Sequence, residues 1–493
     1  MTKIAAVITA GDARTAEGQA RSALSKGADL VELRLDYLVD VSHEVLRNLA
    51  SAVGKRAIAT VRSSAQGGAG RVPDARRAPL LAELARMPFR FLDVEKEADK
   101  ALIPELRRLS RGKTELIVSQ HFPQPVRVPE VADALEACAS LGDVAKVAAS
   151  VDTIEDALAL VDLARRHSRG SLRAIVIGMG GLGMVTRALA EDAGQEIQYA
   201  SVDRPSAPGQ LAFATVLRLR GKTPLVVGLA GHPLGHSISP AIHEAAFVAA
   251  GVPAVYLPFD VDASSLRVIL DAPDRLRLRG FNVTIPHKEA AAELVDELDR
   301  DAEALGAVNT VVVADGWTKG HNTDVYGFHR ALRSLGLRTG GGSALVLGAG
   351  GAAKAVVHVL LQEGAKVAVA NRTTSRAQAL AASFDEPVEV LEPVDLARGG
   401  PWDLLVNATP VGTKGHDGGP PVPDAVIRRS KFLFDLVYNP SETALLAQGR
   451  RAGVPGASGL TMLLHQASRA YELWFEAAPD LKAMETAAKE ALR

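Results

Sequence analysis

The feature that most constrains this chain is a regular alternation of short apolar runs and longer amphipathic stretches over residues 1–220. The apolar runs predict strands, and the amphipathic stretches between them predict helices. The predicted strands are Ile4–Thr9, Leu30–Leu35, Ala57–Val61, Phe89–Val94, Glu115–Ser119, Val144–Ala148, Leu172–Ile177 and Gln198–Val202. Eight βα units in about 220 residues match a (β/α)8 TIM barrel, although a doubly wound α/β sheet has the same content.

Two further α/β segments follow. Turn-forming residues near Gly221 separate the first 220 residues from residues 222–335. A glycine-rich joint, Arg338–Ser343, lies near the start of the next segment, residues 336–458. At roughly 150 residues per domain, a chain of 493 residues suits about three domains.

Composition and charge argue against several classes of function. The net charge is −1 and the isoelectric point is about 6.9, so no basic field exists to attract nucleic acid or an anionic membrane. The longest apolar stretches, such as Ala174–Val185, reach about a dozen residues, whereas a bilayer span needs about 20. Cys138 is the single cysteine, and the N-terminus resembles neither a signal nor a transit peptide. We expect a cytoplasmic protein with small-molecule ligands; an oligomer is compatible with these features.

A glycine-rich turn in the third segment predicts a dinucleotide site. It follows an apolar strand and precedes a helical stretch, Lys354–Glu363, which is the context of a Rossmann fingerprint. The glycines permit a tight turn and a close approach to pyrophosphate, and the helix N-terminus offers free N–H groups. The predicted contacts are Gly348, Ala349, Gly350, Gly351 and Ala352. Gly178–Gly183 has similar spacing but follows the seventh predicted strand, so we expect it to shape a loop at a barrel mouth.

The end of the next predicted strand, Lys366–Ala370, indicates which dinucleotide binds. An NAD site has a carboxylate there for the ribose 2′-hydroxyl, whereas this chain has Asn371, Arg372 and Thr373. A guanidinium suits a 2′-phosphate because it forms charge-assisted hydrogen bonds, so we expect NADP(H). No carboxylate or cysteine completes a ligand set around His232, and we expect no metal.

Charged residues gather at the ends of the predicted barrel strands, where barrel active sites lie. Lys146 stands out because it lies inside an apolar strand, between Val144 and Ala148. Burial there favours the neutral amine, which attacks ketones to form a Schiff base. An outward lysine between helices is the alternative.

Several motifs occur in order between residues 224 and 493: Gly231–Pro240, Phe281–Lys288, Gly306–Thr310, Asn322–Asp324, Asn407–Gly412, Val437–Pro440 and Gly459–Gln466. Together they resemble shikimate dehydrogenase. The resemblance implies a substrate domain of residues 222–335, completed by helices of residues 459–493, and an NADP-binding Rossmann domain of residues 336–458.

The same resemblance implies a catalytic pair, Lys288 and Asp324. It implies that the substrate contacts are Ser237, Ser239, Thr284, Asn309, Tyr438 and Gln466, and it adds Thr409 and Gly459 to the cofactor contacts. The chemistry agrees with these roles. Two hydroxyls one residue apart can both donate to one carboxylate. A lysine ammonium held by a carboxylate stabilises the alkoxide charge that hydride transfer builds on a ketone, and supplies the proton.

The motifs of the first 220 residues are Glu32–Asp36, Arg62–Gly68, Ser119–His121, Lys146, Arg187 and Ser206–Gln210. As a set they resemble type I 3-dehydroquinate dehydratase. The resemblance implies that Lys146 forms the Schiff base and His121 moves the proton. It implies a substrate pocket of Glu32, Arg34, Arg62, Arg187, Ser206 and Gln210. The chain departs from the family at Gln66, where a glutamate is common, and at Phe122, where aspartate usually follows the histidine.

These resemblances together predict a bifunctional enzyme of the shikimate pathway, which leads to chorismate and the aromatic amino acids. The first half would dehydrate 3-dehydroquinate, and the second would reduce the product, 3-dehydroshikimate, with NADPH. Two alternatives remain open. In the first, the second half acts on quinate as well as on shikimate. In the second, one half is inactive and serves as a metabolite-sensing module.

Overall fold

The computed structural model describes residues 1–168, 170, 172–235, 237–414 and 419–493. In this part of the chain, eight parallel strands form the first sheet, in the order β7-β6-β5-β4-β3-β2-β1-β8. They are β1 (Lys3–Ile8), β2 (Leu30–Arg34), β3 (Ala57–Thr60), β4 (Phe91–Glu95), β5 (Glu115–Pro125), β6 (Val144–Ser150), β7 (Ala174–Met179) and β8 (Ile197–Ser201). β1 pairs with both β2 and β8. The Glu196 N–H donates to the Ala174 carbonyl at 3.0 Å, where β7 and β8 approach. The sheet is therefore a nearly closed barrel, which confirms the predicted fold and excludes the open sheet.

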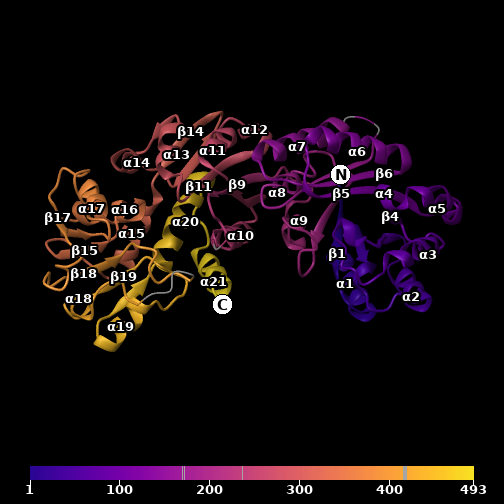
Figure 1. Cartoon of the computed structure of the whole chain (residues 1–493). Helices are drawn as coiled ribbons and strands as arrows, with labels where there is room; N and C mark the ends of the chain where they lie inside the picture. Colours follow the sequence, from indigo (N-terminus) through magenta and orange to yellow (C-terminus); the bar gives the residue numbers. More distant parts are fainter. Residues whose placement is uncertain (169, 171, 236, 415–418) are drawn as a thin grey trace. The chain divides into compact units, whose positions relative to one another are not determined.

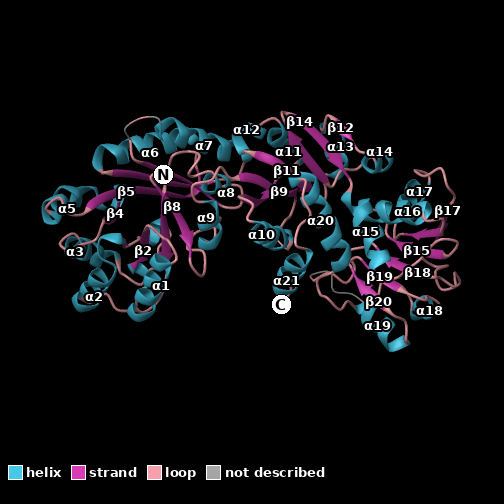
Figure 2. Cartoon of the chain, turned by 180° about the vertical axis from the view of Figure 1, so that it is seen from behind, coloured by secondary structure: helices cyan, strands magenta, loops and turns pink. Residues whose placement is uncertain are grey.

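Helices connect the strands and surround them (Figures 1 and 2). They are α1 (Ala13–Ser25), α2 (His43–Val53), α3 (Asp74–Leu84), α4 (Lys96–Asp99), α5 (Ile103–Ser110), α6 (Val128–Leu141), α7 (Ile154–Ser168), α8 (Met184–Ala188) and α9 (Phe213–Leu219). The predicted strand ends agree with the structure within two residues, with one exception. β5 continues past Ser119 to Pro125, because His121 and Phe122 pair with Ala148 and Ala149 of β6.

The barrel interior changes from apolar to charged along the strands. The apolar floor includes Leu30, Ile58, Phe91, Ile117 and Val144. Two residues further along each of these strands stand Glu32, Thr60, Asp93, Ser119 and Lys146, all buried. Side chains two residues apart on a strand face the same side, so the polar set forms a layer above the floor. This charged layer is where the first site lies.

The second sheet has the order β10-β9-β11-β13-β14-β12, and β13 is antiparallel to β11 and β14. Its strands are β9 (Leu225–Gly231), β10 (Ala254–Asp260), β11 (Leu278–Val283), β12 (Glu297–Leu298), β13 (Thr310–Ala314) and β14 (Trp317–His321). The helices are α10 (Ser239–Ala250), α11 (Ala263–Leu270), α12 (Pro273–Leu276), α13 (Lys288–Leu294), α14 (Arg300–Leu305) and α15 (Thr323–Ser334).

The third sheet is parallel, in the order β17-β16-β15-β18-β19-β20, the doubly wound arrangement of dinucleotide-binding domains. Its strands are β15 (Ser343–Leu347), β16 (Lys366–Ala370), β17 (Val388–Leu391), β18 (Leu404–Asn407), β19 (Leu433–Asp435) and β20 (Gly456–Ser458). The helices are α16 (Gly351–Gln362), α17 (Thr374–Ala381), α18 (Asp424–Arg428) and α19 (Ala444–Ala452). This confirms the predicted Rossmann fold.

The last two helices, α20 (Leu460–Phe475) and α21 (Leu481–Ala491), pack against α15 and α10 (Figure 1). The Trp474 indole N–H donates to the Val311 carbonyl at 2.9 Å and ties α20 to β13. The chain forms two compact units, Met1–Gly228 with Gly251–Leu278, and Leu229–Ala250 with Arg279–Arg493. The three predicted domain boundaries stay predictions. Among the described helices, none is long and apolar enough to span a bilayer.

Candidate active sites

The first cavity lies in the barrel and has a volume of about 320 Å³. Its walls include all the residues that the sequence indicates for the first half: Glu32, Arg34, Arg62, His121, Lys146, Arg187, Ser206 and Gln210. Gly180 also lines it. A Cβ on Gly178 would come within 2.8 Å of the Gly183 Cα, so this glycine run forms a tight turn at the cavity.

Lys146 points into the charged layer of the barrel, and its side chain is 5% exposed. Its Nζ lies 3.0 Å from Asp93 Oδ2 and 3.8 Å from Glu32 Oε1. The centre of the Tyr199 ring lies 4.2 Å from the same nitrogen. The lysine is therefore an inward, cavity-lining amine rather than a side chain between helices.

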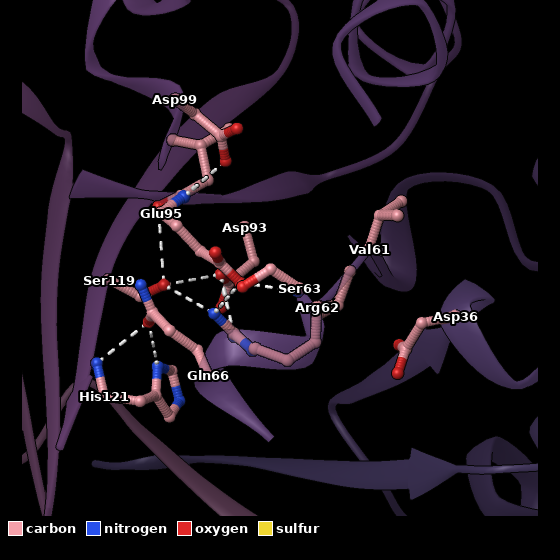
Figure 3. A network of polar contacts seen from close by, with 12 residues as sticks. Asp36, Val61, Arg62, Ser63, Gln66, Asp93, Glu95, Asp99, Ser119 and His121 are labelled. Atoms are coloured by element: carbon pink, nitrogen blue, oxygen red, sulfur yellow. Dashed lines mark hydrogen bonds and ion pairs between the residues drawn. The ribbon is translucent and has the colours of Figure 1, made fainter. Parts of the chain in front are cut away.

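Asp93, which accepts a hydrogen bond from Lys146, belongs to a network of buried polar groups. Figure 3 shows this network around Asp93. Its Oδ1 accepts hydrogen bonds from Arg62 Nη2 at 2.9 Å and Ser119 Oγ at 2.7 Å. Arg62 Nη1 also donates to Glu95 Oε1 at 3.2 Å. Burial alone would raise the pKa of Asp93, but the charges of Arg62 and Lys146 outweigh it and hold this pKa well below its usual range. Asp93 therefore stays ionised beside Lys146.

His121 is held by Gln66 (Figure 3). Gln66 Oε1 accepts from the His121 backbone N–H at 2.9 Å and lies 3.1 Å from Nδ1. Burial lowers the pKa of His121 well below its ordinary value, and the charges of Arg62 and Lys146 lower it further. The neutral ring donates through Nδ1 because its partner is a carbonyl oxygen, and this leaves Nε2 free to accept a proton.

Further cations and hydrogen-bonding groups complete this cavity. Arg34 forms a two-point ion pair with Asp36, with both distances 2.8 Å. Burial lowers the pKa of Arg187 to about 10, and Glu32 partly offsets that effect. Within the described residues, Arg187 Nε has no hydrogen-bond partner. Gln210 Oε1 accepts from the Ser206 backbone N–H at 2.8 Å. A buried cation with an unused donor suits an anionic ligand group.

The second cavity has a volume of about 770 Å³. It is lined by every catalytic and substrate residue that the resemblance implies for the second half: Ser237, Ser239, Thr284, Lys288, Asn309, Asp324, Tyr438 and Gln466. Gly459 and Ala352 of the predicted cofactor set line it as well. The remaining cofactor candidates lie outside its walls, along the turn after β15 and the ends of β16 and β18.

Lys288 and Asp324 lie close together because each stands in the first turn of a helix that begins at the second cavity. Lys288 is the first residue of α13 and Asp324 the second residue of α15. Lys288 Nζ donates to Asp324 Oδ2 at 2.5 Å, and Asn309 Nδ2 donates to Asp324 Oδ1 at 2.8 Å. The Thr323 N–H in turn donates to Asn309 Oδ1 at 2.7 Å, which orients the amide. The carboxylate is thus fixed and keeps the amine at the cavity.

The other predicted contacts of this cavity have fewer partners. The Ser239 N–H donates to Ser237 Oγ at 3.3 Å, so the two hydroxyls share one turn. Thr323 Oγ1 lies 3.4 Å from Gln466 Oε1. Burial raises the pKa of Tyr438, which keeps its phenol protonated as a donor.

The glycine turn has the geometry that a pyrophosphate needs. Gly348 has a φ of 112°, and a Cβ there would lie 2.9 Å from the Ala408 carbonyl oxygen. Gly350 precedes α16, and no side chain of the described residues caps that helix, so its first N–H groups stay available. Asn407 Oδ1 accepts from Thr409 Oγ1 at 2.6 Å.

Arg372 stands exposed at the end of β16, between Asn371 and Thr373. Asn371 Nδ2 donates to the Thr373 carbonyl at 2.9 Å, which folds the segment into a turn. These residues fit a phosphorylated dinucleotide. Among the described residues, no group of three or more His, Cys, Asp or Glu side chains is placed to hold a metal.

Sequence reasoning did not place Asp93 or Tyr199 in the first site, and it named Ser119 only as part of the Ser119–His121 motif. Asp93 is a carboxylate inside an apolar strand, the same signal that singled out Lys146. Tyr199 gave no signal, because an aromatic residue in a buried strand is ordinary.

Comparisons with known proteins separate the two halves of the chain. Residues 4–221 match the family model of Type I 3-dehydroquinase. Residues 229–311 match the Shikimate dehydrogenase substrate binding domain, and residues 331–409 match Shikimate / quinate 5-dehydrogenase. Residues 459–489 match the Shikimate 5'-dehydrogenase C-terminal domain.

Individual relatives cover the second half. Shikimate dehydrogenase (NADP(+)) of Caldanaerobacter subterraneus subsp. tengcongensis is 42% identical over 259 residues, 51% of this chain and 92% of the relative. Shikimate 5-dehydrogenase from Thermus thermophilus, solved with NADP(H) and shikimate, has a TM-score of 0.51 and 38% identity, covering 54% of this chain and 100% of the other. Quinate dehydrogenase from Corynebacterium glutamicum, solved with NAD, has a TM-score of 0.51 and 36% identity over the same shares.

The fold and the two cavities define a two-part enzyme, a lyase barrel followed by a dinucleotide-dependent oxidoreductase. The chain belongs to the type I 3-dehydroquinase family through its first half and to the shikimate dehydrogenase family through its second. The predicted family, both enzyme classes and the NADP-dependent type of dehydrogenase are thereby confirmed.

Proposed function

We propose that the barrel converts 3-dehydroquinate to 3-dehydroshikimate through a Schiff base on Lys146, and that the second half reduces this product to shikimate with Lys288 and Asp324. The observation that carries the proposal is the pairing of each lysine with a carboxylate in its own cavity. We assign dehydration to residues 1–220, substrate binding for reduction to residues 222–335 with 459–493, and NADP binding to residues 336–458.

The first reaction begins when Lys146 Nζ adds to the ketone carbon and water leaves, which gives a C=N iminium. The iminium withdraws electrons from the neighbouring C–H bond, and His121 Nε2 accepts the proton. The resulting enamine expels the hydroxyl group on the next carbon, which leaves as water with the proton that His121 returns. Hydrolysis of the iminium releases the product and restores the amine.

The side chains around Lys146 support this sequence of steps. Gln66 fixes the His121 ring with Nε2 unprotonated, as a base requires. Arg187 has an unused buried donor for the substrate carboxylate, and Gln210 is oriented through Ser206 for a hydroxyl. Asp93 supplies the negative charge that balances the iminium.

In the second reaction, NADPH supplies the hydride when bound. Lys288 donates its proton to the ketone oxygen as negative charge develops there, and Asp324 holds the amine in position. Ser237 and Ser239 offer hydroxyls to the substrate carboxylate, and Tyr438 and Gln466 face the ring hydroxyls. The free N–H groups at Gly351 suit the pyrophosphate, and Arg372 suits the 2′-phosphate.

Two assays test the proposal. Borohydride added with 3-dehydroquinate should reduce the iminium and leave a mass increase on the peptide that contains Lys146. Trapping that persists in Lys146→Ala would disprove this assignment.

Steady-state turnover of 3-dehydroshikimate with NADPH tests the second half. The same assay with quinate and NAD tests the alternative that the similarity to a quinate dehydrogenase suggests.

A further inference from the structure

We propose that Tyr199 is a cation-binding residue of the dehydratase site, and that its ring face stabilises the positive charge of the Lys146 nitrogen in the resting amine and in the iminium. The inference rests on the proposed Schiff-base role of Lys146. It adds a residue that none of the sequence motifs contains.

The ring is fixed against the reacting nitrogen. Tyr199 lies on β8, which pairs with β1 at Ala5, and it belongs to the apolar cluster of the barrel interior. It lines the cavity and is 4% exposed. Lys146 Nζ lies 4.2 Å from the ring centre, well within the roughly 6 Å at which the negative face of an aromatic ring attracts a cation.

An aromatic face differs from the two carboxylates near the same nitrogen. Asp93 and Glu32 also stabilise positive charge, but they do so through carboxylate oxygens, which are proton acceptors in hydrogen bonds. The ring attracts the cation without accepting a proton. It therefore favours the protonated iminium, the form that acidifies the neighbouring C–H bond.

The hydroxyl group of Tyr199 is not needed for this interaction of the ring with the cation. It is buried and has no hydrogen-bond partner among the described residues. Burial raises the pKa of Tyr199 well above its ordinary value, and Glu32 and Asp93 raise it further, so the phenol stays neutral. Tyr199→Phe thus removes an unpaired group and keeps the ring face.

Other charged or titratable groups lie in the same site as Lys146, and a test must leave them unchanged. They are Glu32 and Arg34 of β2, Arg62 of the segment that follows β3, Asp93 of β4, His121 of β5 and Arg187 of α8.

Fluorination of a phenylalanine ring weakens its negative face and alters its size little. A fluorinated series at position 199 therefore changes the cation–ring attraction alone.

The experiment measures borohydride trapping of 3-dehydroquinate against pH in the full chain. It uses the wild type, Tyr199→Phe, and forms of the Tyr199→Phe variant whose new ring carries one to three fluorine atoms. Weaker attraction destabilises the ammonium, so the neutral amine forms at lower pH. We expect the acid-side midpoint of trapping to move down stepwise, by about half to one and a half pH units for the trifluorinated ring. Tyr199→Phe should stay close to the wild type.

Phe91 provides a matched control, because it is a buried ring of the same barrel interior but contacts Arg90 and Arg173. A trifluorinated ring there should leave the midpoint unchanged. The proposal is overturned if the midpoint is constant across the series at position 199, or if Tyr199→Phe shifts it as far as the trifluorinated ring does. A wild type that is never trapped would instead refute the Schiff-base function itself.

Discussion

Both halves of this chain place a lysine beside an aspartate, yet the two pairs have different surroundings. Lys146 and Asp93 are 5% and 1% exposed, on strands inside the barrel. Lys288 and Asp324 are 18% and 12% exposed, at the first turns of two helices. The first pair shares its carboxylate with Arg62 and Ser119. The second shares its carboxylate with Asn309, a neutral amide.

This difference suits two kinds of chemistry. An amine that forms a covalent bond must be held against one substrate atom, with balanced charges around it while its own charge changes. An amine that delivers a proton must face a cavity wide enough for a substrate and a nucleotide. The smaller cavity of about 320 Å³ and the larger one of about 770 Å³ match these needs.

The strongest test of this comparison replaces one lysine at a time and measures both reactions. Lys146→Ala should reduce dehydratase kcat by about 10⁴-fold or more, because it removes the proposed nucleophile, and should leave the dehydrogenase intact. Lys288→Ala should do the opposite, with a smaller loss of about 10²- to 10⁴-fold. Separate steady-state assays of each reaction check both variants. If either variant impaired both reactions, the two sites would not be independent.

The carboxylates should differ in their effect on stability. Asp93→Asn removes a buried counter-charge that Arg62 and Lys146 share and leaves them only the longer contacts to Glu95 and Glu32, so it should lower the unfolding free energy by about 3–5 kcal/mol. Asp324→Asn removes one partner from a more exposed pair and should cost clearly less. Scanning calorimetry compares the two proteins. Equal destabilisation would contradict the distinction drawn here between the two pairs.

Arg372→Ala should affect only the dehydrogenase reaction of the second half, through its affinity for NADPH. A hydrogen bond to a charged group is worth about 1.5–3 kcal/mol, so KM for NADPH should rise roughly ten- to over a hundredfold. KM for NADH and the dehydratase rate should stay the same. Initial rates with both nucleotides check this, and an unaltered NADPH preference would remove Arg372 from the site.

Gln66→Glu should have the smallest effect, on the pH dependence of dehydration. The pKa of His121 is lowered by burial and by Arg62 and Lys146, and a carboxylate at Gln66 would raise it again. The acid limb of kcat/KM should therefore move to higher pH, by about one unit. Gln66→Met removes the hydrogen bond without adding charge and serves as the control. A profile that Gln66→Glu leaves in place would mean that residue 66 does not affect His121.

The sequence alone predicted the strands of the barrel and the glycine turn at Gly348, because both signals are local. Strand periodicity reports burial over a few neighbours, and the turn needs glycine at set spacings. It also indicated Lys146 and His121, whose roles stay predictions until they are tested. The extension of β5 beyond Ser119 was not predicted, because Gln120 and His121 are polar residues and polar residues after an apolar run usually indicate a loop.

Only the tertiary structure decided between a barrel and an open sheet, since that depends on β1 meeting β8 from the far end of the segment. It also decided the partners of Lys146. Asp93 is 53 residues away in sequence, and Tyr199 comes from yet another strand. A strand pattern gives the face on which a side chain lies. The group opposite that side chain is set by barrel closure and strand register, because these long-range pairings determine which residues of distant strands share a layer.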